Sequence, residues 1–69
     1  MIITTQGGEI IDIHEITLQG NEISCKDPAD KRKKKVIGVY ADKRRATEIY
    51  AEIACADWNE MKSYKMPEV

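Results

Sequence analysis

The chain has 69 residues, two cysteines, one histidine and a formal net charge of −1. It is long enough for one domain only, and a chain of this size buries only about 60% of the surface that its unfolded form exposes. A complete zinc set is excluded because His14 has only Cys25 and Cys55 as further strong ligands. We therefore expect no metal and no cofactor, and self-association becomes the expected route to stability.

Three or four short strands are predicted in the first part of the chain. Residues 2–5 are β-branched, which favours a strand. Apolar residues alternate within 11–13 and within 16–18, but the phase slips by one near His14, so this part forms either two short strands or one bulged strand. The Gln-Gly-Asn-Glu sequence at 19–22 predicts a tight hairpin that leads into the third strand.

The second half predicts a last strand and a helix. Residues 35–40 are almost continuously apolar, which is typical of a central strand buried on both faces. Asp42 is a good N-cap, and apolar spacing predicts a helix from about Lys43 to about Ser63. Residues 64–69 read as an extended tail. The expected fold class is α+β, a single domain over 1–69 with a small antiparallel sheet of three to five short strands packed on one long C-terminal helix.

Charge is distributed very unevenly along the chain. Residues 26–45 contain nine basic and three acidic residues, a balance of +6, whereas the rest of the chain carries −7. Cations in the first turn of a helix oppose the dipole there unless an anion neutralises them. The predicted ligand-binding residues are Lys33, Lys34, Lys35, Tyr40, Lys43, Arg44 and Arg45, with Tyr40 or Trp58 available for base stacking. The alternative is an ordinary solvated basic loop.

The predicted helix has more apolar surface than a small sheet covers. Its second apolar face contains small residues and a tryptophan, which are typical of a helix–helix interface. The predicted interface residues are Ala51, Ala54, Cys55 and Trp58. The alternative is that the sheet curls round the helix and covers this face.

No constellation of residues indicates catalysis. His14 lies beside Asp12 and Glu15, but a lone histidine at a strand break is more typical of a surface or turn residue. Cys55 has no basic neighbour in the sequence that would lower its pKa, which disfavours a nucleophile. We therefore expect no enzyme and no catalytic residue.

Three segments carry a resemblance to a known group of proteins. Residues 1–6 end in Thr-Gln, residues 36–46 contain Gly-Val-Tyr before a capped helix, and residues 64–68 read Tyr-Lys-Met-Pro-Glu. The chain resembles small phage-associated proteins of clostridial and bacillar bacteria, which share these features but carry serine before the first glutamine. The resemblance implies a β-then-α fold and a mobile-element origin, and it favours a role against host defence.

These observations lead to a ranked set of expected functions. The first is a small homo-oligomeric binding module that sequesters a phosphorylated, nucleotide-type immune signal, as a sponge does. The second is an inhibitor that binds a host protein or a nucleic acid through the basic segment. The third is a structural or assembly protein with no ligand. No secretion signal and no apolar run of roughly 20 residues is present, so we expect a cytoplasmic protein without a membrane partner.

Overall fold

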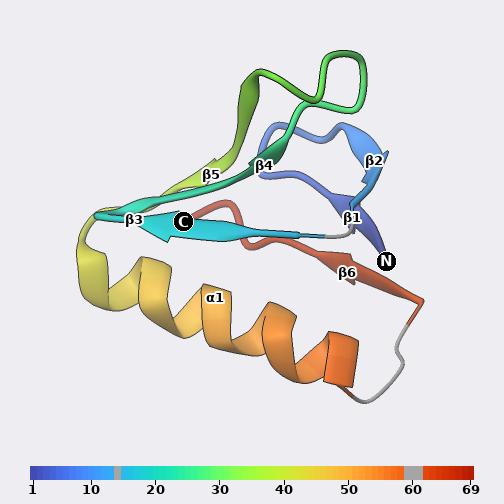
Figure 1. Cartoon of the computed structure of the whole chain (residues 1–69). Coiled ribbons are helices and arrows are strands. Elements are labelled where there is room, and N and C mark those ends of the chain that lie inside the picture. The colour runs from blue at the N-terminus through green and yellow to red at the C-terminus, as the bar shows by residue number, and fades with distance from the viewer. Residues whose placement is uncertain (14, 59–61) are drawn as a thin grey trace.

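The computed structural model describes residues 1–13, 15–58 and 62–69, with only the backbone of residues 57 and 58. Within them the chain forms six strands and one helix, an α+β fold as predicted (Figure 1). In chain order these are β1 (Ile2–Thr4), β2 (Ile10–Asp12), β3 (Thr17–Gln19), β4 (Glu22–Lys26), β5 (Lys34–Val39), α1 (Lys43–Trp58) and β6 (Ser63–Lys65).

The strands are divided between two three-stranded sheets. One has the order β2-β1-β6, with β2 antiparallel and β6 parallel to β1. The other has the order β3-β4-β5 and is antiparallel throughout, with a register shift at Ile23/Ser24. Figure 1 shows α1 lying along one side of the strands, with the loop between β4 and β5 at the far end of the molecule from the helix.

Two parts of the predicted architecture are wrong. The helix spans Lys43–Trp58 instead of continuing to about Ser63, and Ser63–Lys65 form β6, so the first two residues of the predicted tail belong to a strand. The prediction of a single antiparallel sheet is replaced by two sheets, one of which contains a parallel pair. The reason is non-local: residues 63–65 have no strong strand pattern, and they become a strand because β1 offers them a free edge.

The phase slip near residue 14 is resolved as two strands. β2 and β3 belong to different sheets, so the chain changes sheet where the alternation breaks; His14 itself lies outside the described residues. The prediction for the apolar segment at 35–40 is only partly met. It forms β5, but β5 is an edge strand, and Val36 and Val39 remain 44% and 47% exposed.

The core lies between α1 and the inward faces of both sheets. The helix contributes one stripe at the spacing of successive turns, Ala46, Ile49 and Ile53. The other buried members of this core come from the strands and from the segments that flank them: Ile3, Ile13, Ile23, Cys25, Ile37, Tyr40 and Met66. Burying such side chains contributes about 1.5–3 kcal/mol each.

Gln6 joins the outer edge of β5 to the rest of the fold. Its backbone N–H donates to the carbonyl of Ile37 at 3.0 Å. Its side-chain amide forms a pair with Val39, accepting from the N–H and donating to the carbonyl, both at 2.8 Å. The same amide nitrogen donates to the carbonyl of Glu68 at 2.6 Å. One glutamine therefore satisfies the backbone groups that a neighbouring strand would otherwise bind.

The end of the chain packs against β5 at Gly38. A Cβ at this position would lie 2.7 Å from the terminal methyl of Met66 and 3.0 Å from the ring of Tyr40, so glycine is required for this close approach. Met66 is 1% exposed. The Tyr40 hydroxyl donates to the carbonyl of Pro67 at 2.9 Å. The Gly-Val-Tyr and Tyr-Lys-Met-Pro segments are thus in direct contact, and Gln6 lies at the same junction.

Candidate anion-binding site

The loop between β4 and β5 is built by its own acidic residues. The Asp27 carboxylate accepts from the N–H of Ala29 at 2.9 Å, and the Asp30 carboxylate accepts from the N–H of Arg32 at 3.0 Å. The backbone closes the loop through the N–H of Asp27, which donates to the carbonyl of Lys33 at 3.0 Å. Aspartate in this pattern stabilises turns. The two carboxylates therefore fix the backbone of the loop, while the basic side chains extend into solvent.

A shallow hollow of about 210 Å³ lies beside this loop, and we call it the basic hollow. Side chains on a strand alternate between its two faces, so Ser24 and Lys26 of β4 lie on the same face. On the neighbouring strands, Thr17 and Val36 pair with Ser24, and Lys34 pairs with Lys26. Ser24 is only 1% exposed and lies deepest. The full lining is Thr17, Ser24, Cys25, Lys26, Lys31, Arg32, Lys33 and Lys34.

The cations of the basic hollow are only weakly neutralised. Arg32 is 3.5 Å from the Asp30 carboxylate with its side chain 93% exposed, and Lys26 is 3.7 Å from Glu15. Exposed ion pairs of this kind stabilise a protein by less than about 1 kcal/mol. Lys31 and Lys33 form no ion pair with the residues that the structure describes. Five cations thus surround one hollow with little internal compensation.

The remaining predicted lysine of this segment faces elsewhere. Lys35 alternates to the inner face of β5, where its ammonium lies 3.1 Å from one carboxylate oxygen of Glu9 and 3.2 Å from the other. Its side chain is only 27% exposed. Lys35 therefore connects the two sheets, and the structure does not place it with Lys33 and Lys34.

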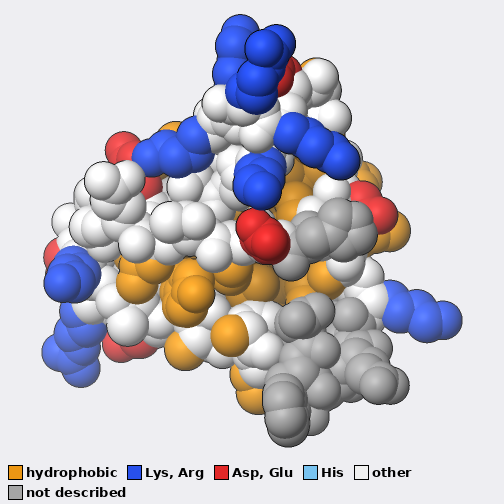
Figure 2. Space-filling model, in the orientation of Figure 1, with side chains coloured by type: hydrophobic (Ala, Val, Ile, Leu, Met, Phe, Trp, Pro, Cys, Tyr) orange, Lys and Arg blue, Asp and Glu red, His pale blue; other side chains and the backbone are white. Residues whose placement is uncertain are grey.

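The basic residues at the start of α1 form a second, separate group. Figure 2 shows basic side chains gathered over the β4–β5 loop and, apart from them, beside the start of the helix. The six residues of β5 separate the two groups, a distance of about 17 Å at the usual rise per strand residue. Arg44 and Arg45 lie 3.6 and 3.4 Å from Glu48, and the Arg45 guanidinium also donates to the backbone oxygen of Val69 at 3.3 and 3.2 Å.

Tyr40 is positioned for packing. It is 3% exposed, and burial raises the pKa of its hydroxyl above the ordinary value for tyrosine. A ring buried to this degree offers no face to a nucleobase in this conformation. The side chain of Trp58, the other predicted stacking residue, lies outside the described residues.

The ligand-binding residues predicted from the sequence leave out five polar contributors to the basic hollow: Thr17, Ser24, Lys26, Lys31 and Arg32. The signal was present, because Ser24 and Lys26 are two apart on one strand and therefore share a face. Thr17 could not be placed without the register of the hairpin. Cys25 also lines the hollow, but burial raises the pKa of its thiol, which makes it a poor nucleophile.

The predicted helix interface is uncovered in its described part. Ala51, Ala54 and Cys55 are all exposed, so the alternative in which the sheet covers this face is wrong for these residues. Trp58 contributes backbone only to the description.

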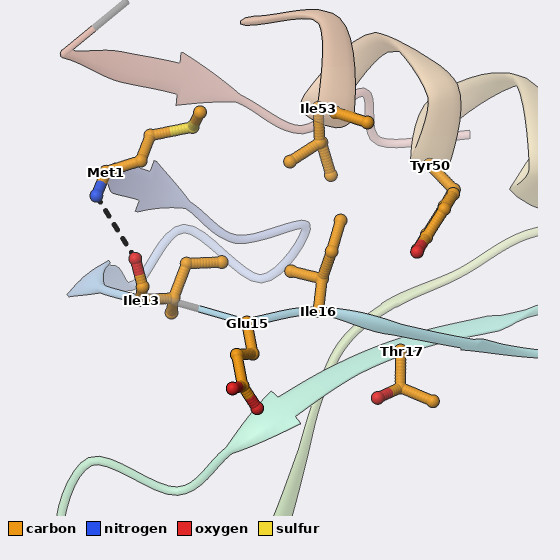
Figure 3. A pocket seen from close by; sticks show the side chains of 8 residues that line it. Met1, Ile13, Glu15, Ile16, Thr17, Tyr50 and Ile53 are labelled. Atoms are coloured by element: carbon orange, nitrogen blue, oxygen red, sulfur yellow. Dashed lines mark hydrogen bonds between the residues drawn. The ribbon is translucent and has the colours of Figure 1, made fainter. Parts of the chain in front are cut away.

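Two further cavities of about 350 Å³ each adjoin the β2–β3 connection. The first lies between that connection and α1, and Figure 3 shows Ile16 and Ile53 pointing toward one another across it. At its side the Met1 amino group donates to the carbonyl of Ile13 at 3.1 Å. The second lies beneath the basic loop, between Asp12 and Pro28.

Among the described residues no group of acidic, histidine or cysteine side chains is arranged to hold a metal ion.

Comparison of the chain with protein-family models, with curated proteins and with solved structures finds no match. The described helix is too short and too polar to cross a membrane.

Proposed function

We propose that this protein is a small binding module that captures a phosphorylated, nucleotide-type molecule through the basic hollow. The observation that carries the proposal is the gathering of five cationic side chains around two hydroxyls, Thr17 and Ser24, on one face of a hairpin. Phosphate oxygens accept hydrogen bonds from all of these groups, and charge-assisted bonds are the strongest of them.

The size of the hollow restricts the part of the ligand that enters it. A volume of about 210 Å³ is below the roughly 300–1,000 Å³ of pockets that enclose a whole drug-sized molecule. It suits a phosphate or pyrophosphate group, with the remainder of the ligand lying outside. The acidic remainder of the chain favours a small ligand at one end over a long polyanion, because like charges elsewhere repel the latter.

The proposal includes self-association and sequestration. A homo-oligomer formed through the open helix face would present several basic hollows, which suits a protein whose task is to remove a signal molecule. The phage origin and the role against host defence come from the resemblance of three sequence segments and remain predictions.

The proposal is tested by calorimetric titration with pyrophosphate, a cyclic dinucleotide and ADP-ribose. The deciding variant is Lys31→Ala/Lys33→Ala, and the matched control is Lys43→Ala/Arg44→Ala, which removes the same charge at the helix start. We expect the first to weaken binding at least about tenfold, the loss of two charge-assisted contacts, and the second to change it less than threefold. Equal effects of the two variants would contradict a site at the hollow.

A thermal-shift series gives an independent measurement. A ligand at a hundredfold excess over Kd raises the free energy of unfolding by about 2.7 kcal/mol if it binds only the folded chain. No shift with any of the three ligands would overturn the proposal. Binding to an oligonucleotide with a steep negative dependence on salt would favour the second expected function, since phosphate contacts release counterions.

A further inference from the structure

β3 is the open edge of the second sheet. In the order β3-β4-β5 its outer side carries no strand among the described residues. Gln19 pairs with Glu22 across the two-residue turn, so this pair exchanges backbone hydrogen bonds and the next pair, Leu18 with Ile23, does not. The N–H and carbonyl of Leu18 therefore point away from β4, toward the side on which another strand would lie.

Apart from its short length of three residues, this edge lacks the usual protection against strand pairing. Residues 16–21, Ile-Thr-Leu-Gln-Gly-Asn, contain no charge and no proline in a chain in which 33% of residues are charged. Natural edges are generally protected by lysine, proline, a bulge or a covering segment. The opposite edge of the same sheet is covered by Gln6, and β6 carries Lys65.

The open edge of β3 and the uncovered face of α1 lie side by side. Ile16 and Thr17 from the β3 side and Tyr50 and Ala54 from the helix line the same cavity. Figure 3 shows Ile16 pointing from the β3 side toward Ile53 and Tyr50 on the helix, and Figure 2 shows hydrophobic side chains between the strand layer and the helix on this face of the molecule. One partner approaching from this side would therefore contact the strand edge and the helix face together.

We propose that the partner on this side is a second copy of the chain, paired antiparallel with β3 about a two-fold axis at Leu18. Such an axis places Thr17 opposite Gln19 of the partner subunit and joins the two Leu18 residues by two N–H···O bonds. No charge faces a like charge in this arrangement, whereas the basic hollow against its own copy would oppose lysines. The inference rests on the self-association in the proposed function and is independent of the anion.

The surface required is within reach of so small a chain. A stable interface buries about 800 Å² per partner, roughly one-sixth of the 4966 Å² that this chain exposes. The β3 pairing extends two three-stranded sheets into one of six strands and brings the Ala51, Ala54 and Cys55 face of each helix toward the interface. Small residues allow such close approach.

The test removes the outward N–H of Leu18. N-methylation of Leu18, introduced by chemical ligation, deletes that donor, and Leu18→Pro does so genetically; Leu18→Ala is the control, because it removes side-chain packing and keeps the N–H. Sedimentation equilibrium should give twice the 7.9 kDa chain mass for the wild type and for Leu18→Ala. We expect the N-methylated chain to dimerise about 30- to 100-fold more weakly, since two symmetric hydrogen bonds are lost.

Several results would overturn the inference. These are a wild type that stays monomeric at millimolar concentration, an N-methylated chain that dimerises normally, or a monomer that pairs with a foreign extended peptide. Pyrophosphate titration of each variant distinguishes a failure of the inferred dimer from a failure of the proposed function. An intact dimer without anion binding overturns only the proposed capture of the anion. Anion binding by a wild-type monomer overturns the dimer and the self-association in the proposed function, and leaves the capture of the anion standing.

Discussion

The two edges of the β3-β4-β5 sheet differ in how their backbone groups are satisfied. Along β5, Gln6 supplies an amide that pairs with Val39, and Met66 packs onto Gly38. Along β3, the outward groups of Leu18 have no strand beside them in the described part of the chain. The covered edge uses the two ends of the sequence, so the same segments cannot also cover β3. The outer edge of β3 therefore stays open in the described part of the chain, and it is this edge that we propose pairs with a second copy.

The comparison also explains which motif residues are structural. The Thr-Gln, Gly-Val-Tyr and Tyr-Lys-Met-Pro segments, which carry the resemblance to phage-associated proteins, converge on the covered edge. The hydroxyl of Thr5 accepts from the N–H of Glu9 at 3.0 Å and holds the turn beside it. A serine would offer the same hydroxyl. These segments specify the fold, whereas the proposed binding surfaces lie on the basic loop and on β3.

The largest effect is expected at Met66, on the covered edge. Met66→Ala should lower the free energy of unfolding by about 2–5 kcal/mol, because a fully buried side chain is lost and a cavity remains beside Gly38. This change in the free energy of unfolding is measured by urea denaturation, with circular dichroism as the signal. A loss below 1 kcal/mol would show that the end of the chain does not close this edge.

A pair of glutamines compares the two edges directly. Gln6→Ala removes three side-chain hydrogen bonds with the backbone and should destabilise by about 2–3 kcal/mol. Gln19→Ala on β3 removes only an exposed contact with Lys34 and should change stability by less than about 0.5 kcal/mol. The urea midpoints of the two variants measure this difference in stability. Equal midpoints would show that the β5 edge is not held more firmly by Gln6 than the β3 edge is by Gln19.

The contact between β6 and the helix should make stability fall at alkaline pH. Burial, followed by the hydrogen bond that its hydroxyl donates to Glu52 at 2.6 Å, raises the pKa of Tyr64 above its ordinary value. The folded state holds the hydroxyl proton of Tyr64 more tightly than the unfolded state does. The protonated hydroxyl therefore makes its full contribution to the free energy of unfolding below about pH 10, the pKa of tyrosine in the unfolded chain. This contribution is lost as the pH rises above that value. Tyr64→Phe should flatten this part of the curve of unfolding free energy against pH. If the variant keeps the same slope of unfolding free energy against alkaline pH, the proposed role of Tyr64 is wrong.

The smallest effect is expected at the lysine that joins the two sheets. A double-mutant cycle on Lys35 and Glu9 should give a coupling energy of about 0.2–1 kcal/mol, the range for partly exposed pairs. The corresponding Lys33→Ala change should leave stability unaltered, because Lys33 forms no ion pair with described residues. A destabilising Lys33→Ala would assign that side chain to the fold rather than to a ligand.

Much of the fold could be predicted because local chemistry decides it. The turn at Gly20, where φ is +61°, follows from residues that tolerate a left-handed backbone. The start of α1 follows from Asp42, whose carboxylate accepts from the N–H of Arg45 at 2.9 Å. The core stripe of the helix and the break in alternation near residue 14 follow from the period of the apolar residues, and the structure decides that this break separates two strands.

The basic cluster was predicted as a single site, and the structure divides it. Sequence proximity grouped Lys33 and Lys34 with Lys35 and with the start of α1. Strand alternation sends Lys35 to the opposite face, and the length of β5 separates the helix start from the loop. Distances of this kind depend on which strands pair, and no local pattern in the sequence contains that information.

The sequence by itself determined the α+β class, the hairpin, the helix start and the uneven charge, since each depends on neighbouring residues. Only the tertiary structure decided that residues 63–65 pair with β1, that Tyr40 is buried and that Ser24 and Thr17 join the lysines. These features arise from hydrogen bonds and contacts between segments far apart in the chain, where the geometry of the whole fold outweighs the preference of any single residue.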